Sequence, residues 1–402
     1  MNAIFWVLLA TLAATPDKVT NGKRAVGKPW TLTFEAELRI SSNDVDDDHV
    51  WAGSNQVVQV DRKGHMFLMD QRDSRLLEWD ASGAFVRAIG GRGEGPGEFQ
   101  NMVNFQIFDD GRALVFENFG AVTRISLYDS SFAFVERKSL NLPFFPRFGT
   151  FNQDRSLMAA TTTRVDPQRQ VEITEYLIVA CDLGEEAFTK KESLLYWETM
   201  SLDSTRINDP NHWAEFLGQR FRVLSKGQNA FAVFEGKDVM YSAQADAYEV
   251  TRWQAKGNEL VKNRTIRRDY DPIPLTQAEV DALILPVREA ILTQLPTNLQ
   301  ELISVNLIRR AAKLAEFPGV KFPIAGLSLM EDGTLIVIHE VNPQTRLNRG
   351  DLFDREGRYR GSFTIGDDAL TTMVFRGRHA YAVETHEDGS NSLVRFRFDL
   401  KK

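Results

Sequence analysis

The sequence has a single cysteine, Cys181, in 402 residues, so no disulfide can form within the chain. The apolar stretch "YLIVACDLG" around it predicts a buried strand, and we therefore expect a structural thiol instead of a reactive one. Long hydrophobic runs are also missing. The apolar run from Ala3 to Ala14 is too short for a transmembrane helix, which needs about 20 residues, and we expect no membrane span elsewhere.

The apolar run at the start is followed by small residues, as is typical of a secretory signal peptide cleaved near Ala13 or Ala14. No lysine or arginine precedes the run, so a buried strand or a wrongly assigned start codon are the alternatives. We expect a signal peptide over residues 1–14, a linker over 15–29 and a periplasmic or secreted protein. No cysteine follows the run closely, which excludes a lipoprotein anchor at this point.

Neither sign of charge dominates, since 48 basic residues stand against 55 acidic ones and the net charge is −7. A chain that is acidic overall has no general attraction to nucleic acid, and none is expected as a partner. A hydrophobic content of 43% and a charged content of 26% are typical of a soluble globular protein, which argues against disorder.

Recognisable catalytic and metal-binding motifs are scarce. The six histidines show none of the short spacings of zinc motifs, and no G-x-S-x-G elbow occurs. The stretch "GGRGEGPGEFQ" (90–100) lacks the Lys and Ser or Thr of a P-loop and the third glycine of a dinucleotide motif. The acidic run "NDVDDDH" (43–49) lacks the glycine and glutamate of an EF-hand, so we expect a solvated turn there. No cofactor is predicted, and calcium at this run is the alternative.

The chain contains an internal repeat instead. A polar turn followed by an apolar strand occurs six times, as "DRKGHMFLMD" (61–70), "DDGRALVFE" (109–117), "NQDRSLMAAT" (152–161), "SKGQNAFAVF" (225–234), "EDGTLIVIHE" (331–340) and "FRGRHAYAVE" (375–384). A second strand follows each copy and a third follows the first five, while an inner strand is expected before each turn, starting near Asn55, Asn104, Arg147 and Arg222 in the first four copies. The turn glycines Gly64 and Gly111 are 47 residues apart, the length that four short strands need. This pattern predicts an all-β fold, a six-bladed β-propeller over residues 30–402.

The sixth copy ends after three strands, and "WTLTFEAELRI" (30–40) is an unassigned strand of the outer type. We predict that this N-terminal strand closes the last blade, because closure leaves no sheet edge unpaired. "IGGRGEGPGEF", followed by a strand, "DDG" and another strand, resembles the junction between repeats of NHL-type six-bladed β-propellers, especially those that many bacteria export. The resemblance covers roughly residues 30 to 400 and implies the fold, but such folds carry unrelated functions.

Residues 273–322 interrupt the repeat between blades four and five. "LTQAEVDALILPVREAILTQL" begins with a capping box, Thr276 and Glu279, and predicts a helix that Pro286 should kink or divide. A second helix is predicted over "TNLQELISVNLIRRAAKLAEF" (297–317). Some apolar residues of this insertion should pack on the propeller, namely Leu283, Ile284, Leu292, Leu295, Leu302 and Ile303. Both the insertion and residues 90–100 connect an outer strand to the next inner strand, so both should flank the same mouth of the channel.

Arginines are enriched in the segments assigned to that mouth. The candidate ligand-binding residues are Arg72, Arg75, Arg92, Arg124, Arg147, Arg220 and Arg346, with Arg164 and Arg169 nearby and Arg309 and Arg310 on the insertion. A guanidinium suits a carboxylate or phosphate ligand. The alternative is that most of these arginines pair with neighbouring acids such as Asp70, Asp73 and Glu117.

Two classes of function remain open at this stage. The favoured one is a monomeric, noncatalytic binding or scaffold module that recognises a protein, peptide or glycan at the channel mouth beneath the insertion. The other is a propeller hydrolase or lyase, lactonase-like and metal-dependent, with its residues spread over several blades. A calcium-dependent lactonase would need Asp, Asn and Glu at several inner-strand starts, where Asn55 and Asn104 alone fit.

Overall fold

The computed structural model describes residues 16–42, 51, 58–119, 122–140, 145–152, 156–182, 187–225, 230–257, 259–293, 295–342, 347–366, 373–386 and 390–402. The predicted signal peptide, the acidic run 43–49 and Arg346 lie outside these residues. Arg147 lies in a described strand, but only its backbone is described.

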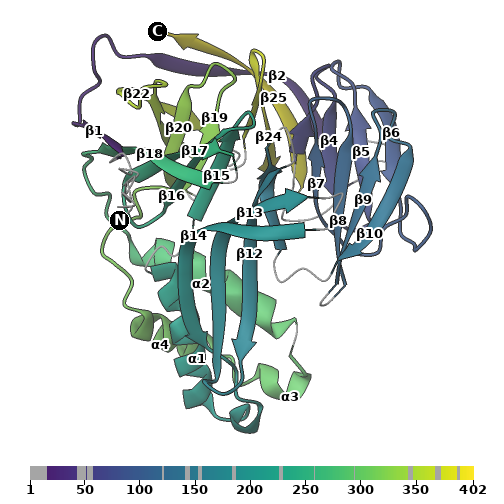
Figure 1. The fold of residues 1–402 in the computed structure, drawn as a ribbon. Helices are drawn as coiled ribbons and strands as arrows, with labels where there is room; N and C mark the ends of the chain where they lie inside the picture. The colour runs from purple at the N-terminus through teal and green to yellow at the C-terminus, as the bar shows by residue number, and fades with distance from the viewer. Residues whose placement is uncertain are drawn as a thin grey trace, which may run out of the picture.

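The described strands form six sheets, and each sheet is one blade of a six-bladed β-propeller, as predicted (Figure 1). Blade one contains β3 (Val58–Val60), β4 (Met66–Asp70), β5 (Arg75–Trp79) and β6 (Phe85–Gly90). Blade two contains β7 (Met102–Ile107), β8 (Ala113–Phe119), β9 (Val122–Tyr128) and β10 (Phe134–Leu140). Blade three contains β11 (Phe145–Phe151), β12 (Leu157–Asp166), β13 (Val171–Asp182) and β14 (Ala187–Met200).

Blades four to six follow the same antiparallel order from the inner to the outer strand. Blade four contains β15 (Ala230–Glu235), β16 (Val239–Gln244), β17 (Glu249–Lys256) and β18 (Glu259–Arg268). Blade five contains β19 (Gly326–Leu329), β20 (Leu335–Asn342), β21 (Leu347–Phe353) and β22 (Tyr359–Gly366). Blade six contains β23 (Val374–Arg376), β24 (His379–Thr385), β25 (Asn391–Lys401) and β2 (Thr31–Ser41).

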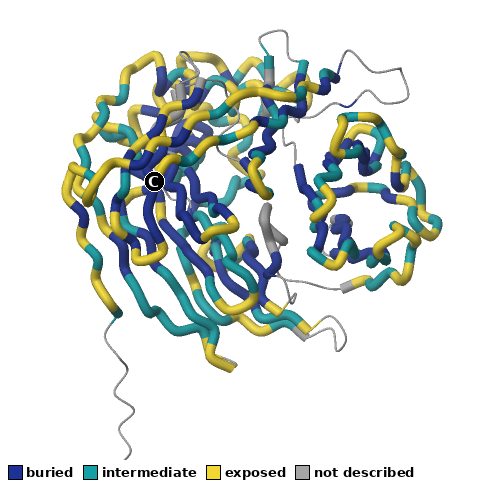
Figure 2. The backbone as a smooth tube through the Cα atoms, turned by 90° about the horizontal axis from the view of Figure 1, so that it is seen from above, coloured by how far each residue is buried: buried dark blue, intermediate teal, exposed yellow. Residues whose placement is uncertain are grey.

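Six hydrophobic clusters hold the ring together, and each joins two consecutive blades. One cluster joins blade six to blade one, with Tyr381 and Leu393 packed against Val58 and Leu68. Both faces of a sheet are therefore covered by neighbouring blades, which explains why alternation within the strands is only partial. Figure 2 shows buried residues concentrated in the interior of the sheets and exposed residues along the outside.

The N-terminal strand β2 pairs antiparallel with β25 from Thr31–Lys401 to Ser41–Ser392, so it closes the last blade as predicted. The segment expected to be a linker behaves differently, because β1 (Asp17–Asn21) pairs parallel with β18 as a fifth strand of blade four. Asn21 holds this strand in place. Its buried amide donates to the carbonyls of Arg267 and Gly357 and accepts from the backbone of Tyr359. Such pairing is not visible in the sequence because it depends on a strand far away in the chain.

The glycine-rich stretch 90–100 is a junction between blades, as predicted. Phe99 is fully buried and packs between Leu76 and Ile89 of blade one and Phe105 of blade two. Gly90 has φ +83°, and a Cβ there would lie 2.2 Å from the ring of Phe99. Only glycine fits that position, for steric as well as conformational reasons.

The helical segments differ from the prediction in three ways. A helix that was not predicted, α1 (Pro210–Ser225), follows β14 after a short 3-10 turn (Ser204–Arg206). The predicted first helix, α2 (Gln277–Leu292), begins at the Thr276 capping box but continues through Pro286 without dividing. The predicted second helix is two helices, α3 (Thr297–Gln300) and α4 (Val305–Ala315), because Ser304 caps a new start.

The apolar side of the insertion packs on α1 and not on the ring. Ile284, Ile303 and Ile308 join Trp213 and Phe221 in one cluster, whose described members all come from the helices and adjoining loops. Leu292, Leu295 and Leu302 pack against the same cluster, whereas Leu283 is 48% exposed. The expectation that these residues pack on the propeller was wrong, because they pack on α1 instead. In Figure 1 the helices lie together below the ring, beside the long strands β12 and β14.

Blade four is also shifted from its predicted place. The fourth repeat, "SKGQNAFAVF", was assigned to a turn and a second strand, with an inner strand near Arg222 before it. Arg222 lies instead in α1, and the second part of the repeat is the inner strand β15. The true turn is at 236–238, ahead of β16. The error arose because "EGKDVMYSAQ" has the same pattern of turn glycine and apolar strand.

Candidate functional site

Two connected hollows occupy the centre of the ring. The inner hollow has a volume of about 400 Å³ and the outer one about 820 Å³. Gln59, Gln106, Phe234 and Phe375 line both, so the two are continuous. The outer hollow opens at the hairpin turns between the inner and second strands of all six blades. We call this end of the channel the turn end, and the opposite end, where outer strands cross to the next inner strand, the loop end.

Apolar side chains line the inner hollow, although polar atoms also form a substantial part of its surface. Inner strands of three blades supply most of the side chains, namely Phe231, Phe234, Leu327, Leu329, Val374 and Phe375. The inner strands are the edges of their sheets, so their unpaired backbone groups also face the channel. Apolar walls of this kind favour an apolar group of a ligand.

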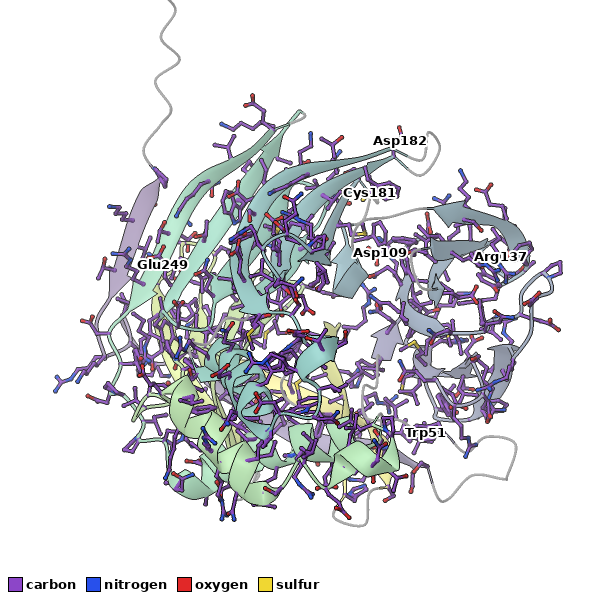
Figure 3. All side chains as sticks on the ribbon, turned by 90° about the horizontal axis from the view of Figure 1, so that it is seen from below. Trp51, Asp109, Arg137, Cys181, Asp182 and Glu249 are labelled. Carbon is purple, nitrogen blue, oxygen red and sulfur yellow. The ribbon has the colours of Figure 1, made fainter. Side chains whose placement is uncertain are left out.

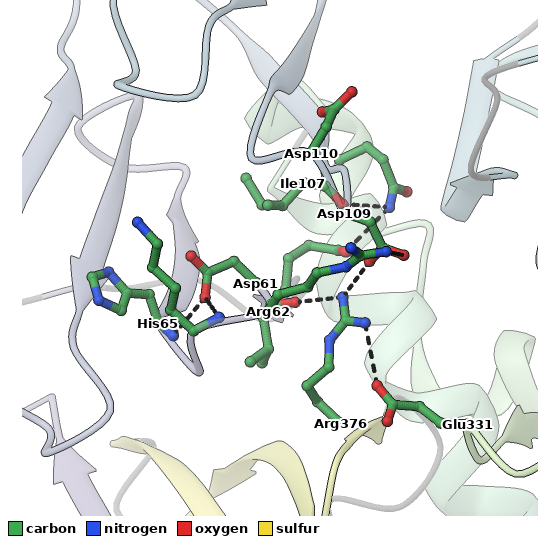
Figure 4. Close-up of polar contacts among 12 residues, drawn as sticks. Asp61, Arg62, His65, Ile107, Asp109, Asp110, Glu331 and Arg376 are labelled. Atoms are coloured by element: carbon green, nitrogen blue, oxygen red, sulfur yellow. Dashed lines mark hydrogen bonds and ion pairs between the residues drawn. The ribbon is translucent and has the colours of Figure 1, made fainter.

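Charged side chains from four blades surround the turn end (Figure 4). Arg62 of blade one and Arg376 of blade six both contact Asp109 of blade two, each at 3.0 Å. Arg376 also lies 3.3 Å from Glu331 of blade five and donates to the carbonyl of Val60. Figure 3 places Asp109 towards the middle of the molecule, with Arg137 and Glu249 on opposite outer sides.

Asp109 is the centre of this ionic group. Partial burial would raise the pKa of Asp109, but the hydrogen bond from Arg62 and the positive charge of Arg376 outweigh it and hold the pKa below its usual value. The carboxylate is therefore ionised and held by two guanidiniums. This arrangement makes Asp109 a poor general base and a good fixed point for the arginines.

An amide pair forms the neck between the two hollows. The Gln106 side-chain nitrogen donates to Gln59 Oε1 at 3.3 Å and to the carbonyl of Ile107 at 3.2 Å. The Ile107 carbonyl can only accept, so this contact fixes which way the amide points. Gln106 Oε1 is then left buried, with no hydrogen-bond partner in the described part of the chain. Buried polar atoms normally have partners, so this oxygen is an exception among the described residues, and its burial keeps it from direct contact with a ligand in the hollow.

Two cations on the β3–β4 turn have donors to spare. Arg62 is 67% exposed, and of its guanidinium nitrogens only Nη2 contacts Asp109 among the described residues. Lys63 is exposed and lines the outer hollow, and no partner of its ammonium group is found within the described ranges. A ligand anion at this rim could accept from both side chains.

The predicted arginines lie at the loop end or in blade three, where acids pair with most of them. Arg75 donates to Asp70, which is fully buried, and Arg72 lies 3.0 Å from Asp73. Arg92 donates to the carbonyl of Arg72. These contacts favour the internal pairing that was the alternative interpretation.

Other arginines of the predicted set also lie close to neighbouring polar groups of the protein. Arg124 lies opposite the buried Glu117 in the β8–β9 register, and Arg220 contacts Glu172 at 2.8 Å. Arg169 binds Glu198, and Arg164 lies near enough to lower the pKa of that carboxyl. Arg309 and Arg310 contact Asp281 and Asn211 within the helical layer. Anion binding by this set stays a prediction.

A second polar cluster lies between blades four and five. Asp351 is fully buried and contacts Arg268 at 2.8 Å, Ser362 at 2.5 Å and the hydroxyl of Tyr248. Burial would raise the pKa of Asp351, but His339 and Arg268 outweigh it and lower the pKa. The Arg268 guanidinium stacks 4.0 Å over the ring of Tyr359. This enclosed arrangement fastens the two blades to each other.

Sequence reasoning missed the residues of the turn end. Gln59 and Gln106 each stand five positions before their turn glycines, Gly64 and Gly111, so an alignment of the repeats could have placed both on the channel axis. Nothing in the sequence reports that Gln106 Oε1 lacks a partner. Within the residues that the structure describes, no group of three or more His, Cys, Asp or Glu could hold a metal ion.

Burial raises the pKa of the Cys181 thiol to about 12, in line with the predicted structural role. No helix in the described segments is both long and apolar enough to cross a membrane.

Comparisons with known proteins agree with the fold. The family model described as a 6-bladed beta-propeller matches residues 47–199, which span blades one to three. None of the curated proteins matches the chain.

Solved structures with a similar fold have low sequence identity to this chain. A Bacteroides fragilis protein described as exported is 11% identical, with a TM-score of 0.49 over 96% of this chain and 100% of its own. A member of the duf4221 family from Bacteroides vulgatus is 9% identical, with a TM-score of 0.45 over 92% and 99%. A catalytically inactive virginiamycin B lyase from Staphylococcus aureus is 7% identical, with a TM-score of 0.38 over 92% and 99%. These similarities carry no argument about activity.

Proposed function

We propose that the protein is an exported, noncatalytic β-propeller of the NHL-like type, which recognises a protein, peptide or glycan partner at the turn end of its channel. The observation that carries this proposal is the continuous hollow, to which all six blades contribute and which combines apolar walls with a charged rim. Ligand sites are usually concave and mostly apolar, with a few well-placed polar groups.

The proposal places recognition at the opposite mouth from the one expected beneath the helical insertion. At the loop end, Asp70 and Glu117 are fully buried, with Arg75 against the first and Arg124 in register with the second. At the turn end, Arg62 and Lys63 keep exposed donors beside an open hollow. The rim charges of a binding site chiefly set orientation and the rate of encounter, and these two are positioned for that role.

Charge reversal at each end tests the proposal. Arg62→Glu/Lys63→Glu changes the turn end, and Arg72→Glu/Arg92→Glu changes the loop end on residues that are equally close to the surface. Each purified variant is used to capture partners from the extracellular and periplasmic fractions of the native host, and captured molecules are identified by mass spectrometry. We expect Arg62→Glu/Lys63→Glu to abolish capture of the partner and Arg72→Glu/Arg92→Glu to retain it.

Loss of the partner with the second pair alone would return recognition to the mouth beneath the insertion and overturn the proposal. Chemical conversion of a captured molecule by the wild-type protein would favour the hydrolase or lyase alternative. Lys256→Glu on the outer part of blade four is the matched control for adding negative charge to an exposed lysine outside the hollow.

A further inference from the structure

Resting on the proposed function, we infer the chemical class of the partner: the channel binds an extended peptide segment that pairs with the free edge of β15, the inner strand of blade four. An apolar side chain of the segment enters the part of the inner hollow between blades three and four, and an acidic residue lies at the turn end near Arg62 and Lys63. Three features of the channel support this assignment.

The first feature is the accessible edge of β15. Residues 230–234 of this strand line the inner hollow, and residues 234–236 line the outer one. Consecutive side chains of a strand point to opposite faces, so a hollow that touches every residue reaches the edge itself. Five consecutive residues, Phe231 to Glu235, are part-exposed, whereas no other inner strand has two such residues in a row where burial is described.

This edge carries backbone groups that no described strand uses. β15 pairs with β16 alone, from Ala230–Gln244 to Glu235–Val239. In an antiparallel pair, alternate residues exchange hydrogen bonds with the partner strand, and the residues between them direct N–H and C=O to the other side. Here that side is the hollow, which helps to explain its polar surface. An extended peptide satisfies such groups in series, whereas a glycan has no matching alternation of N–H and C=O.

The second feature is a side pocket, the part of the inner hollow that lies between blades three and four. Ala232 faces blade three, and the hollow also touches Ala159, Leu177 and Leu194 on the second, third and outer strands of that blade. The small side chains of Ala159 and Ala232 leave this space open. Neighbouring residues of paired strands share a face of the sheet, so a peptide residue opposite Ala232 directs its side chain into the side pocket. A side chain such as Val, Ile or Leu suits these apolar surroundings.

The third feature is the charge of the rim. Each acid that lines the outer hollow has a cationic neighbour, as in the pairs Asp109–Arg376, Glu331–Arg376 and Glu235–Arg355. Arg62 and Lys63 line the same hollow and are exposed. A segment that follows β15 out of the channel therefore meets spare positive charge at the turn end, and an acidic residue complements it.

A phage-displayed library of random heptapeptides, selected on the immobilised wild-type protein, provides the probe. We expect the enriched sequences to share an apolar residue with Asp or Glu on one side of it. The best sequence is then synthesised and N-methylated at each backbone nitrogen in turn, and isothermal titration calorimetry measures binding. Strand pairing predicts that methylation weakens binding about tenfold at alternate positions and has little effect between them. Failure to enrich any peptide, or an N-methyl series without this alternation, would overturn the inference.

Protein variants locate the peptide. Ala232→Leu fills the side pocket and should weaken binding at least about tenfold. Ala255→Leu on β17 is the matched control, because Ala255 belongs to the same cluster but lines neither hollow, and it should leave binding unchanged. Thermal melts check that both variants fold, and the N-methyl series on the wild-type protein depends on neither.

The rim is tested separately. Lys63→Gln should weaken binding of the acidic peptide but not of its counterpart with an amide in place of the carboxylate. Lys256→Gln, outside the hollow, should affect neither peptide. Equal effects of the two lysine variants would contradict the placement of the acidic residue at the turn end.

The outcomes separate this inference from the proposed function. If partner capture depends on the turn end but the N-methyl series shows no alternation, the assignment of a peptide strand is wrong and the proposed function stands. Capture of an oligosaccharide through the turn end would have the same meaning. If capture does not depend on the turn end, the proposed function fails. Peptide binding that Ala232→Leu leaves unchanged would also overturn the inference, since the peptide would then lie outside the side pocket.

Discussion

Both ends of the channel carry charged groups but use them differently. At the loop end, Asp70 and Glu117 of the second strands are fully buried; Arg75 donates to Asp70, and Arg137 lies 3.7 Å from Glu117. At the turn end, Asp109 is 18% exposed and Arg62 is 67% exposed, beside the hollow. Removing one partner of a buried ion pair destabilises the fold strongly, whereas an exposed pair contributes little and leaves donors available.

This difference shows why an enrichment in arginine does not by itself distinguish internal ion pairs from a ligand site. The loop end collects arginines because the buried acids of the blades need partners. The turn end has fewer cations, but its geometry leaves them incompletely used. The test of a candidate site is therefore which donors and acceptors remain unsatisfied, and this depends on the folded structure.

The largest expected effect is on stability at the loop end. Asp70→Ala removes the fully buried acceptor of Arg75 Nε and of the Arg72 backbone N–H, and leaves Arg75 only its 3.4 Å contact with the more exposed Asp73. Breaking a buried pair in this way costs about 3–5 kcal/mol. Urea denaturation measures the free energy of unfolding. The exposed partner provides the control, because Asp73→Ala should cost less than about 1 kcal/mol, and similar losses for both variants would contradict the account.

Acid should weaken the helical layer next. Hydrogen bonds from Lys321 and from Thr276 lower the pKa of Glu279 from 4.5 to about 2, against the opposing effect of burial. Since the folded pKa lies below the unfolded one, this stabilisation is present above pH 4.5 and is lost as the pH falls towards 2. The shift corresponds to roughly 3 kcal/mol at most.

Unfolding free energies of wild type and Glu279→Gln, measured across this pH range, check the prediction. The stability difference between the two should shrink as the pH falls from 4.5 to 2. A difference that stays constant would show that the carboxylate of Glu279 has no special role in docking the helices.

A smaller change in stability is expected at the turn end. Asp109→Ala removes the shared partner of Arg62 and Arg376, but the group is partly exposed, so the loss should be about 1 kcal/mol or less. A loss as large as that of Asp70→Ala would remove the contrast between the two ends.

Much of the fold was predictable because the repeat leaves local signals. Turn glycines, the buried Phe99 at the first junction and the closing strand β2 all follow from spacing and composition. The misplacement of blade four has a physical cause, since a glycine followed by an apolar strand occurs twice in that region. Helix α1 did leave a signal, because Trp213, Leu217 and Phe221 are four residues apart and all buried.

The candidate site was less predictable than the fold. Polar residues occupy the turns of any propeller. The sequence therefore does not show whether Arg62 and Asp109, on the turns of two different blades, contact each other. Gln106 matters because its nitrogen is used and its oxygen is not, which depends on the position of Ile107 and Gln59 in space. The parallel pairing of β1 likewise joins segments that are far apart in the chain.

The most direct measurement is a hydrogen–deuterium exchange footprint of the captured partner on the wild-type protein. Recognition at the turn end predicts slower exchange on binding in the turns 61–65, 109–112 and 331–334, with no change at 71–74 and 90–100. Protection confined to 71–74, 90–100 or the helices α2 and α4 would contradict the central claim and place the partner at the loop end.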